Sequence, residues 1–528
     1  KNKGMIYMII EKMKIINFKK FYGEKDIIFN EDFNVLIGNN EAGKSSILLA
    51  LDLVLSGSQS KIETIGLENL FNCKIIKEFM DSNKDITKLP ELIIELYLKD
   101  TGIIEFSGNN NQEKRETDGI YLKISPDEEF LKIISESLSK ENSVFPFEYY
   151  KCTFKKFSDE PYNNYKKPIR HIIIDGSNIS SEYYMKDYIS SLYSAYTDNS
   201  LKNLYNNEFR KLKKDFETNS LSSLNDKVPN VDFGLSTNNK YSLENNLTIY
   251  EQGVNIWNKG SGTQCMLKIK SSIEKQAENI DLILIEEPEN HLSDINMKKI
   301  LKDIMNSNKK QMFVTTHNSM ICSRLNLKKI IALNETSIST TEFNSISDDT
   351  ANFFVKCPSN TILNFILSSK VILVEGAAEY ILLEKLYELY TNNNPSIDNI
   401  NIISVNGLSF ERYLEIAQSL KIKVAVITDN DKDYENKIVN KYSKYDSDDN
   451  INVFSDTDNS RYTFEVCLFN DNQAYINNNN ITQATDKLNY MLNNKSESAY
   501  RLLEALEKDT NNFKIPKYIE DAFKWIKN

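Results

Sequence analysis

The segment Gly38-Asn39-Asn40-Glu41-Ala42-Gly43-Lys44-Ser45 decides the fold of the N-terminal half of the chain. It matches the pattern G-x-x-x-x-G-K-[ST] and stands between an apolar strand-like run, FNVLIG, and an apolar helix-like run, SSILLALDLVL. This context predicts a P-loop, in which backbone N–H groups and the helix N-terminus cradle phosphate. We expect nucleotide contacts from the whole loop: Gly38, Asn39, Asn40, Glu41, Ala42, Gly43, Lys44, Ser45 and Ser46.

Two further carboxylates end a second apolar run, DLILIEEPE at 281–289. A nucleotide hydrolase needs one carboxylate to hold Mg²⁺ through water and another to polarise the attacking water. We assign Glu286 to the first role, beside Ser45 as a direct Mg²⁺ ligand, and Glu287 to the second. The following run, QMFVTTHN, places His317 near the γ-phosphate.

Length and composition bound the rest of the chain. A chain of 528 residues is too long for a single hydrophobic core, so we expect two to four domains. Hydrophobic residues make up 40% and charged residues 26%, which is typical of a soluble globular protein, and no apolar run is long enough for a membrane span. The first residues lack a signal-peptide pattern, so we expect a cytoplasmic protein that does not associate with membranes.

The cysteines and the net charge bear on whether the chain binds zinc, forms disulfides or contacts DNA. The six cysteines are scattered without a CxxC pair, which speaks against a zinc site or a disulfide framework. The net charge of −11 is unusual for a DNA-binding protein, yet local basic segments such as RKLKK at 210–214 can contact a phosphate backbone. A solvated helix face explains RKLKK equally well.

Strand-like and helix-like runs alternate in blocks that predict separate domains. The first block resumes from 253 to 333, so the intervening residues, about 58–250, form an insertion with a helical part at about 181–225. We therefore predict an ATPase domain at 1–345, a linker at 346–369 and a second α/β domain at 370–528.

Acidic residues follow two strand-like runs of this second domain. Glu375 and Glu379 follow KVILV, and Asp429 and Asp431 follow KVAVIT. In a parallel sheet, functional residues collect at the carboxyl ends of strands, so these acids can converge on one or two hard cations. Each acid alone is more often a surface residue, and DND alone is more often a turn; their order and spacing together favour a metal site.

Four segments resemble the motifs of ABC-type ATPases of the structural-maintenance and Rad50 sort. GNNEAGKSS, KGSGTQCM at 259–266, LILIEEPENHL and VTTHN correspond to the Walker A, signature, Walker B with D-loop, and H-loop motifs. The resemblance implies that Ser261 and Gly262 complete the nucleotide site of a second subunit, and hence a homodimer or higher oligomer. The signature reads GSGTQ where this class usually has SGGQ.

The acids of the second domain resemble the Toprim motif of topoisomerases, primases and nucleases. An ABC-type ATPase followed by Toprim is similar to the OLD (overcoming lysogenisation defect) nucleases, which include the Gabija large subunit and some retron effectors. Two more positions match that family: Glu465 in TFEVCLF resembles a later metal ligand, and Lys495 resembles a lysine that contacts the scissile phosphate. Without the family, Lys495 is better explained as a surface lysine at a helix start.

The resemblance implies an α/β protein with an ABC/SMC-like P-loop ATPase, a helical insertion for dimerisation and a Toprim domain with a Rossmann-like parallel sheet. It further implies an ATP-regulated DNA endonuclease in anti-phage defence that uses ATP and Mg²⁺, or Mn²⁺ at the Toprim site. Implied partners are DNA, a second copy, and a helicase-like subunit or a reverse transcriptase with its retron DNA. The alternative is an ATP-driven nucleic-acid sensor or assembly module whose Toprim domain binds without cutting. The residues in named roles are Glu287, His317, Glu375, Asp429, Asp431 and Lys495 for catalysis, and Ser45, Glu286, Glu375, Glu379, Asp429, Asp431 and Glu465 for metal.

Overall fold

The computed structural model describes residues 8–162, 169–176, 182–236, 242–273, 280–305, 310–333, 338–339, 342–356, 361–407 and 409–527. Cys357 lies outside these residues, as does part of the predicted linker. The chain divides into two compact units, each described by itself. Unit 1 comprises Lys1–His317 and Glu335–Thr340, and unit 2 comprises Asn318–Asn334 and Thr341–Asn528. The domain boundary placed at 345 from the sequence stays a prediction.

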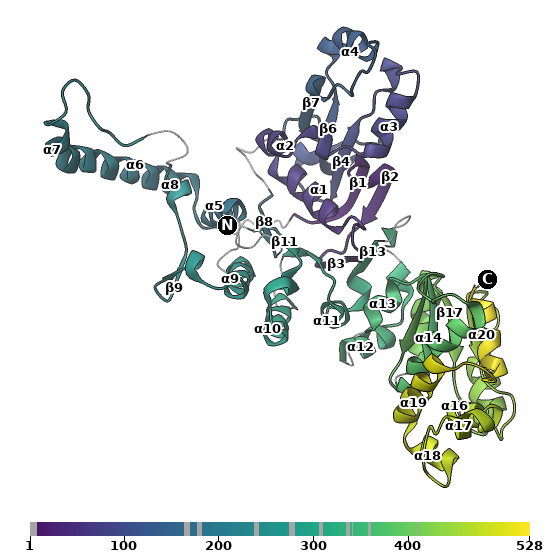
Figure 1. The fold of residues 1–528 in the computed structure, drawn as a ribbon. Coiled ribbons are helices and arrows are strands. Elements are labelled where there is room, and N and C mark those ends of the chain that lie inside the picture. The colour runs from purple at the N-terminus through teal and green to yellow at the C-terminus, as the bar shows by residue number, and fades with distance from the viewer. Residues whose placement is uncertain are drawn as a thin grey trace. The chain divides into compact units, whose positions relative to one another are not determined.

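Unit 1 contains an antiparallel sheet that begins with a hairpin (Figure 1). The hairpin strands are β1 (Ile10–Phe18) and β2 (Phe21–Ile28), and β1 pairs on its other side with β4 (Leu92–Leu98). The sheet continues through β6 (Thr117–Pro126) to β7 (Tyr150–Lys156), with the short β5 (Ser107–Gly108) also along β6. Every residue of β4 is buried, which explains why its sequence, LIIELYL, is apolar apart from Glu95.

A parallel sheet in unit 1 positions the P-loop. Its strands are β3 (Phe33–Gly38), β12 (Gln311–Thr315), β11 (Leu282–Glu286) and β8 (His171–Asp175), in that order. Helix α1 (Lys44–Ser56) follows β3 and is buried along most of its length, because apolar residues occupy nearly all of its faces. Helices α9 (Ser261–Ile273) and α10 (Asp294–Met305) complete the block that the sequence predicted.

The remaining elements of unit 1 are mostly short. They are α2 (Gln59–Ile65), η1 (Leu67–Asn69), α3 (Cys73–Asp81), η2 (Ile86–Lys88), η3 (Ile104–Phe106), η4 (Glu128–Phe130), α4 (Leu131–Leu138), η5 (Phe147–Tyr149), β9 (Tyr250–Glu251), β10 (Val254–Asn255), η8 (Ile256–Asn258), η9 (Pro288–His291) and β14 (Ile338–Ser339).

The predicted helical part of the insertion is present. It consists of α5 (Glu182–Tyr196), α6 (Asn199–Phe216), the π-helical η6 (Glu217–Leu221) and α7 (Ser222–Asn225), and α8 (Leu243–Asn246) follows. Asp198 caps α6 by accepting the Leu201 N–H. No residue of α6 is buried. Even its apolar residues Leu204 and Leu212 are exposed, at 54% and 64%.

Unit 2 is built on a four-stranded parallel sheet in the order β16-β15-β17-β18. The strands are β15 (Lys370–Val374), β16 (Ile400–Ser404), β17 (Lys423–Ile427) and β18 (Ile451–Phe454). Its helices and short helical turns are α11 (Ser319–Arg324), η10 (Leu327–Lys329), η11 (Glu342–Ser345), α12 (Asp348–Lys356), α13 (Ile362–Ile366), α14 (Ala377–Thr391), α15 (Phe410–Leu420), η12 (Glu435–Asn440), η13 (Ser443–Tyr445), α16 (Phe464–Asp471), α17 (Gln473–Asn478), α18 (Lys487–Asn493), α19 (Lys495–Lys508) and α20 (Lys517–Lys527), and β13 (Ile330–Leu333) also belongs to it.

One strand of unit 2 was not predicted from the sequence. Strand β18 has only four residues, INVF, of which strand alternation places two on the inner face, and it lies at the sheet edge. The C-terminal segment forms two helices, α19 and α20. Within the described part of the chain, no helix is long and apolar enough to cross a membrane.

Candidate nucleotide and metal sites

The loop from β3 to α1 has the backbone that its glycines allow. Gly43 has φ 102°, and a Cβ at this position would lie 2.9 Å from Phe21 Cζ, so only glycine fits. Lys44, which is 5% exposed, donates from Nζ to the carbonyl oxygens of Gly38 at 2.9 Å and Asn39 at 3.1 Å. Burial lowers the pKa of Lys44, and the nearby carboxylate of Glu287 partly opposes this shift. The lysine is therefore held within the phosphate loop.

Glu286 stands at the end of β11, directly opposite Asp175 at the end of β8 in parallel register. Burial raises the pKa of Glu286, a hydrogen bond from Ser45 lowers it, and the like charge of Asp175 adds to the rise. Ser45, Asp175 and Glu286 line one cavity of about 420 Å³. Ser45 and Glu286 thus lie together, their predicted role in holding Mg²⁺ stays a prediction, and Asp175 is a carboxylate that the motifs did not identify.

The signal for Asp175 was nonetheless in the sequence. HIIID, like LILIE, is an apolar run that ends in an acid. Gly176 follows, and its N–H donates to the Glu286 carbonyl at 2.7 Å. A Cβ on Gly176 would lie 2.2 Å from the Glu287 carbonyl oxygen. The glycine therefore allows β8 and β11 to end side by side with their acids together.

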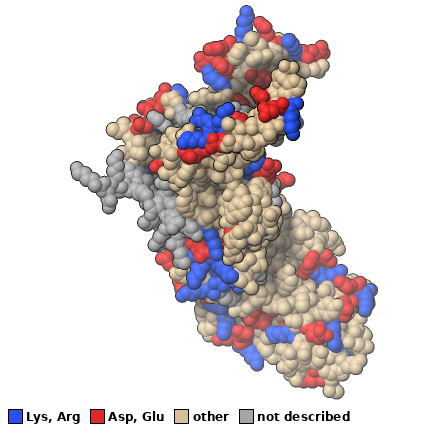
Figure 2. All heavy atoms as spheres, turned by 90° about the vertical axis from the view of Figure 1, so that its left-hand side faces the viewer, with Lys and Arg blue, Asp and Glu red and all other residues tan. Residues whose placement is uncertain are grey.

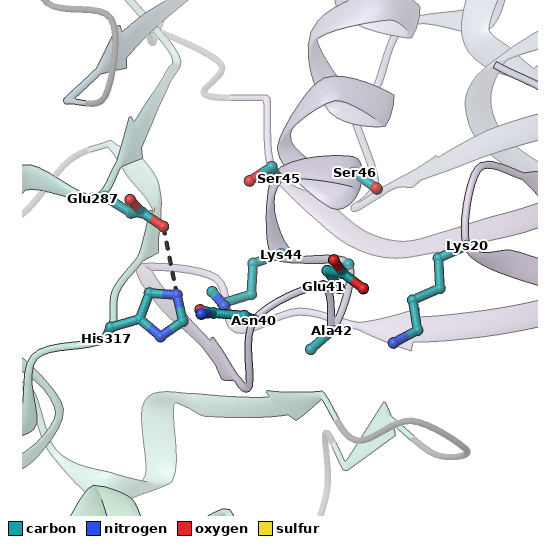
Figure 3. Close-up of a pocket in the computed structure, with 10 residues that line it drawn as sticks. Lys20, Asn40, Glu41, Ala42, Lys44, Ser45, Ser46, Glu287 and His317 are labelled. Carbon is teal, nitrogen blue, oxygen red and sulfur yellow. Dashed lines mark ion pairs between the residues drawn. The ribbon is translucent and has the colours of Figure 1, made fainter. Parts of the chain in front are cut away.

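Glu287 and His317 face each other beside the P-loop (Figure 3). His317 Nε2 lies 3.5 Å from Glu287 Oε1, and Asn290 Nδ2 donates to Glu287 Oε2 at 2.9 Å. Burial, followed by the positive charge of Lys44, lowers the pKa of His317, so the ring is neutral at physiological pH. A neutral imidazole beside a carboxylate can accept or relay a proton at this position.

Glu289 is a second functional candidate that the motifs did not single out. Its Oε1 accepts from Thr316 Oγ1 at 2.7 Å and from the His317 N–H at 2.6 Å. Both donors lie in the segment after β12, so Glu289 fixes the backbone that carries His317.

A pocket of about 430 Å³ is formed by the loop residues Asn40 to Ser46 together with Glu287, His317 and Lys20 (Figure 3). Lys20 comes from the β1–β2 turn, and Figure 3 shows it on the far side of the loop from His317. Two lysines, the helix N-terminus and the loop N–H groups suit a polyphosphate. Gly38 and Asn39 do not line this pocket but accept from Lys44.

The signature residues lie at the start of α9. Ser261 is the first residue of the helix, and a Cβ on Gly262 would lie 2.3 Å from the His291 carbonyl oxygen. Neither residue lines the nucleotide pocket of its own chain. Gly262 therefore brings α9 against the turn that follows Glu287.

Two buried acids, Glu379 and Glu465, and the half-buried Asp429 gather in unit 2. Glu379 lies in the first turn of α14 and accepts the Gly376 N–H at 3.2 Å, Asp429 follows β17 and accepts the Phe464 N–H at 2.8 Å, and Glu465 lies in α16. Burial, then the charges of Glu379 and Glu465, raises the pKa of Asp429 to about 8. Burial also raises the pKa of Glu379. The three carboxylates thus repel one another in a poorly solvated place.

One lysine partly offsets this charge. Lys495, the first residue of α19, has its Nζ 3.1 Å from Glu465 Oε2. Burial lowers the pKa of Lys495, but Glu465 outweighs this and the pKa is raised overall. The predicted Lys495 and Glu465 are therefore adjacent.

Glu375 and Asp431 are more exposed than the other acids. Glu375, after β15, is exposed, but its charge adds to the rise in the pKa of both Asp429 and Glu379, so it lies near them. The side chain of Asp431 is 62% exposed and lies 3.8 Å from Lys437, and its backbone has φ 50°. Between Asp429 and Asp431, Asn430 is buried and donates to the carbonyl oxygens of Asp456 and Asp458 at 2.7 and 3.1 Å.

The residues fit a divalent cation in their donor chemistry. Glu379, Asp429 and Glu465 supply hard carboxylate oxygens, and both oxygens of Glu465 are buried, with the Lys495 ion pair to Oε2 as their recorded contact among the described residues. Among the described residues, no three His, Cys, Asp or Glu side chains stand as a ready-made metal-ligand group. Several of these oxygens instead accept backbone N–H groups, as at Glu379 and Asp429.

The loop that leads to Glu465 is held by Arg461, which sequence motifs did not identify. Its guanidinium donates to both oxygens of Asp471 at 2.8 and 2.7 Å and from Nε to Asp456 at 2.6 Å. Bidentate pairs of this kind fix orientation as well as charge. Arg461 and Asn430 therefore place the segment before α16 against the end of β17.

Known protein families match both the N-terminal and the C-terminal part of the chain. The family model of the AAA ATPase domain matches residues 8–322, and that of the overcoming lysogenization defect protein-like TOPRIM domain matches residues 366–431. Septu protein PtuA of Bacillus mycoides is 28% identical over 193 residues, which cover 33% of this chain and 27% of that protein. Structural maintenance of chromosomes protein 1 of Schizosaccharomyces pombe is 32% identical over 90 residues, 16% of this chain and 7% of that protein. The matched segments are thus a small part of either relative.

Solved structures resemble each half in turn. The Smc head bound to the C-winged helix domain of ScpA covers 63% of this chain and 97% of its own, at 15% identity and a TM-score of 0.34. The C-terminal region of the OLD protein from Xanthomonas campestris pv. campestris covers 30% of this chain and 92% of its own, at 20% identity and a TM-score of 0.23.

Proposed function

Because the chain belongs to the AAA ATPase domain family and carries an overcoming lysogenization defect protein-like Toprim domain, we propose that it is an ATP-regulated, divalent-metal-dependent DNA endonuclease of anti-phage defence. The observation that carries the proposal is the group of carboxylates formed by the buried Glu379 and Glu465 and the half-buried Asp429, beside Lys495. Buried like charges are costly, and a bound cation is the usual reason to keep them.

In this proposal the acids of unit 2 hold Mg²⁺ or Mn²⁺. Glu379 and Glu465 are the buried ligands, Asp429 is a half-buried one, and the exposed Glu375 and Asp431 reach the site from its solvent side. A divalent cation there would lower the pKa of water and stabilise charge on the leaving oxygen. Lys495 sits next to Glu465 and would stabilise charge on the scissile phosphate.

In unit 1 the same proposal gives each P-loop residue a role. Lys44 neutralises the β and γ phosphates, Ser45 and Glu286 hold Mg²⁺, and Glu287 orients the attacking water. His317 lies beside Glu287 and keeps its carboxylate in place. Ser261 and Gly262 would act on the nucleotide of a second copy, since they do not line their own pocket.

We further propose that α6 forms part of a homodimer interface. Leu201, Leu204, Leu212 and Phe216 lie along one side of the helix at helical spacing, and each is exposed. An apolar stripe on a helix with no buried residue favours a partner helix.

DNA remains the proposed substrate in spite of the net charge. On the face drawn in Figure 2, lysines and arginines form local clusters between acidic ones, so the charge is unevenly distributed. Local clusters are sufficient for backbone contacts. A helicase-like subunit, or a reverse transcriptase with its retron DNA, stays the proposed further partner.

The decisive experiment incubates purified protein with supercoiled plasmid and Mg²⁺ or Mn²⁺, with and without ATP. The test variants are Glu375→Ala and Asp429→Asn for cleavage and Lys44→Ala for nucleotide binding, and Glu504→Gln on the exposed side of α19 is the control. We expect nicking or linearisation that Glu375→Ala and Asp429→Asn abolish while ATP hydrolysis persists. Cleavage that survives both variants would contradict the site, and plasmid binding without cutting in any condition would favour the sensor.

A further inference from the structure

Helices α14 and α19 both begin at the acid site of unit 2. Lys495 is the first residue of α19, and its charge acts on Glu379 as well as on Glu465. Glu379 is the third residue of α14, and α19 packs along that helix. The two helices therefore run side by side away from the carboxylates, which places the first turn of α19 at the level of Glu379.

Ser498 lies on the buried face of α19, one turn beyond Lys495. The buried residues of this helix repeat at helical spacing, and they are Ser498, Ala499, Leu502, Ala505 and Leu506. Lys495 precedes the first two of them by three and four positions, and residues so spaced share one face of an α-helix. Ser498 is therefore directed toward the first turn of α14, where Glu379 lies.

The hydroxyl of Ser498 has no hydrogen bond within the described part of the chain. The residue is 1% exposed, and its Oγ is both shielded from solvent and without a partner. The carbonyl of Asn494 accepts the Ser498 N–H at 2.9 Å, yet the hydroxyl does not turn to this acceptor of its own helix. A buried hydroxyl without a partner is costly, so we expect it to find an acceptor when the site is occupied.

The carboxylates of the acid site have acceptor capacity to spare. Both oxygens of Glu465 are buried, with the Lys495 ion pair to Oε2 as their recorded contact, and Glu379 Oε2 accepts the Gly376 N–H at 3.2 Å. An ionised carboxylate can accept about four hydrogen bonds. A hydroxyl donor can orient a carboxylate without adding positive charge, whereas a second lysine would repel a bound cation.

We infer that Ser498 is a positioning residue of the metal site, whose hydroxyl donates to the Glu379 carboxylate and holds it in the orientation that binds the cation. Carboxylates that bind a metal are themselves held by hydrogen bonds, and these partners contribute to metal affinity. Lys495 then balances charge at the site, and Ser498 fixes the orientation of Glu379. The inference rests on the proposed metal site but not on DNA cleavage, because it concerns binding of the ion alone.

Binding of Mn²⁺ to the full-length chain without nucleotide tests this role. Free Mn²⁺ is measured by electron paramagnetic resonance, and Asp429→Asn identifies the ion that belongs to unit 2. We expect Ser498→Ala to weaken the binding of this ion by about tenfold or more, as the loss of an outer partner of a metal does. Ser498→Thr keeps the hydroxyl and should bind Mn²⁺ with an affinity close to that of the wild-type chain.

Stability without metal separates a positioning role from a packing role. Ser498→Ala removes a buried hydroxyl that has no partner and introduces a better helix former, so the melting temperature of the metal-free chain should stay the same or rise. Thr391→Val, at the other end of α14, is the matched control. Thr391 Oγ1 donates to the Tyr387 carbonyl at 2.8 Å, so its loss should lower the melting temperature and leave Mn²⁺ binding unchanged.

The possible outcomes distinguish this inference from the proposed function. Loss of Mn²⁺ in Asp429→Asn together with unchanged affinity in Ser498→Ala would overturn the role of Ser498 and leave the metal site standing. Equal Mn²⁺ binding by the wild-type chain and Asp429→Asn would overturn both. Weaker Mn²⁺ binding by Ser498→Ala with a lower melting temperature of its metal-free form would reduce Ser498 to a packing residue, which also contradicts the inference.

Discussion

Asp175 and Glu286 end two adjacent parallel strands at the same level, and both line the cavity that Ser45 enters. Two carboxylates so placed favour a bound cation between them. Burial raises the pKa of Glu286, and the charge of Asp175 raises it further. Asp175 is therefore a candidate for the water shell of the nucleotide-bound Mg²⁺.

Replacing Asp175 with Asn should weaken Mg²⁺ at the nucleotide site. Outer-shell partners of a metal contribute about 10- to 100-fold in affinity, so we expect the Mg²⁺ concentration for half-maximal ATP hydrolysis to rise by roughly tenfold or more. The measurement is ATPase rate against Mg²⁺ at saturating ATP. Asp281→Asn, at the opposite end of β11, is the matched control, and an unchanged Mg²⁺ dependence in Asp175→Asn would limit Asp175 to a structural role.

Two glycines of the signature segment make a matched pair. A Cβ on Gly262 would lie 2.3 Å from the His291 carbonyl oxygen, whereas a Cβ on Gly260 would meet nothing within 4 Å. Gly262→Ala should therefore destabilise unit 1 by about 1–3 kcal/mol, as overpacking does, and lower ATP hydrolysis. Gly260→Ala should leave the melting temperature unchanged. Equal melting temperatures for the two variants would show that α9 can move away from η9 without cost.

Asp281 predicts how stability depends on pH. It stands just before β11 and accepts the Arg170 N–H at 2.9 Å, and burial raises its pKa to about 6 from an ordinary value of 3.8. Because the folded pKa is the higher one, its contribution to stability is full below pH 3.8 and is lost as pH rises to about 6. The loss is on the order of 3 kcal/mol, from a pKa shift of about two units at about 1.36 kcal/mol per unit.

Asp281→Asn should remove this dependence. In urea unfolding between pH 4 and 7, the wild-type chain should lose stability relative to the variant as pH rises, and the difference should level off above about pH 6.5. Glu507→Gln, an exposed acid, is the reference for general charge effects. Parallel curves for wild type and Asp281→Asn would contradict the raised pKa.

The apolar stripe of α6 predicts a concentration-dependent dimer. Leu204→Glu with Leu212→Glu places two charges in the stripe and should convert the dimer to monomer in sedimentation experiments. Asn203→Glu with Asn207→Glu adds the same charge on the opposite side of the helix and should leave the dimer intact. A dimer unaffected by the leucine substitutions would place the interface elsewhere.

The sequence was sufficient to predict an element wherever a long apolar run led into a functional motif. The P-loop, the strand ending in Glu286 and Glu287, and the strand before Glu375 were all predicted, because strands buried on both faces need unbroken apolar residues. The position of β8 beside β11 was not, since a run such as HIIID does not encode its neighbours in a sheet. Asp175 was missed for that reason.

The unit 2 acids show a second limit. Spacing placed Asp429 and Asp431 together, but Asp429 lies beside Glu379 and Glu465 whereas the side chain of Asp431 is 62% exposed and lies 3.8 Å from Lys437. The anchoring of Asn430 to the carbonyls of Asp456 and Asp458 depends on a loop 26 residues away in sequence. Local patterns do not report contacts of this range.

This separation distinguishes the two aspartates in a nuclease assay. Asp429 is half-buried and interacts with Glu379 and Glu465, whereas the side chain of Asp431 is 62% exposed and lies near Lys437. We expect Asp429→Asn to abolish metal-dependent cleavage, with a loss of at least about 100-fold, and Asp431→Asn to reduce it by about tenfold or less. Cleavage rates at several Mg²⁺ concentrations would separate the two, since a peripheral ligand is compensated by more metal. Equal, uncompensated losses would mean that Asp431 turns inward when the metal binds, and that the bound site is organised differently from the unbound one.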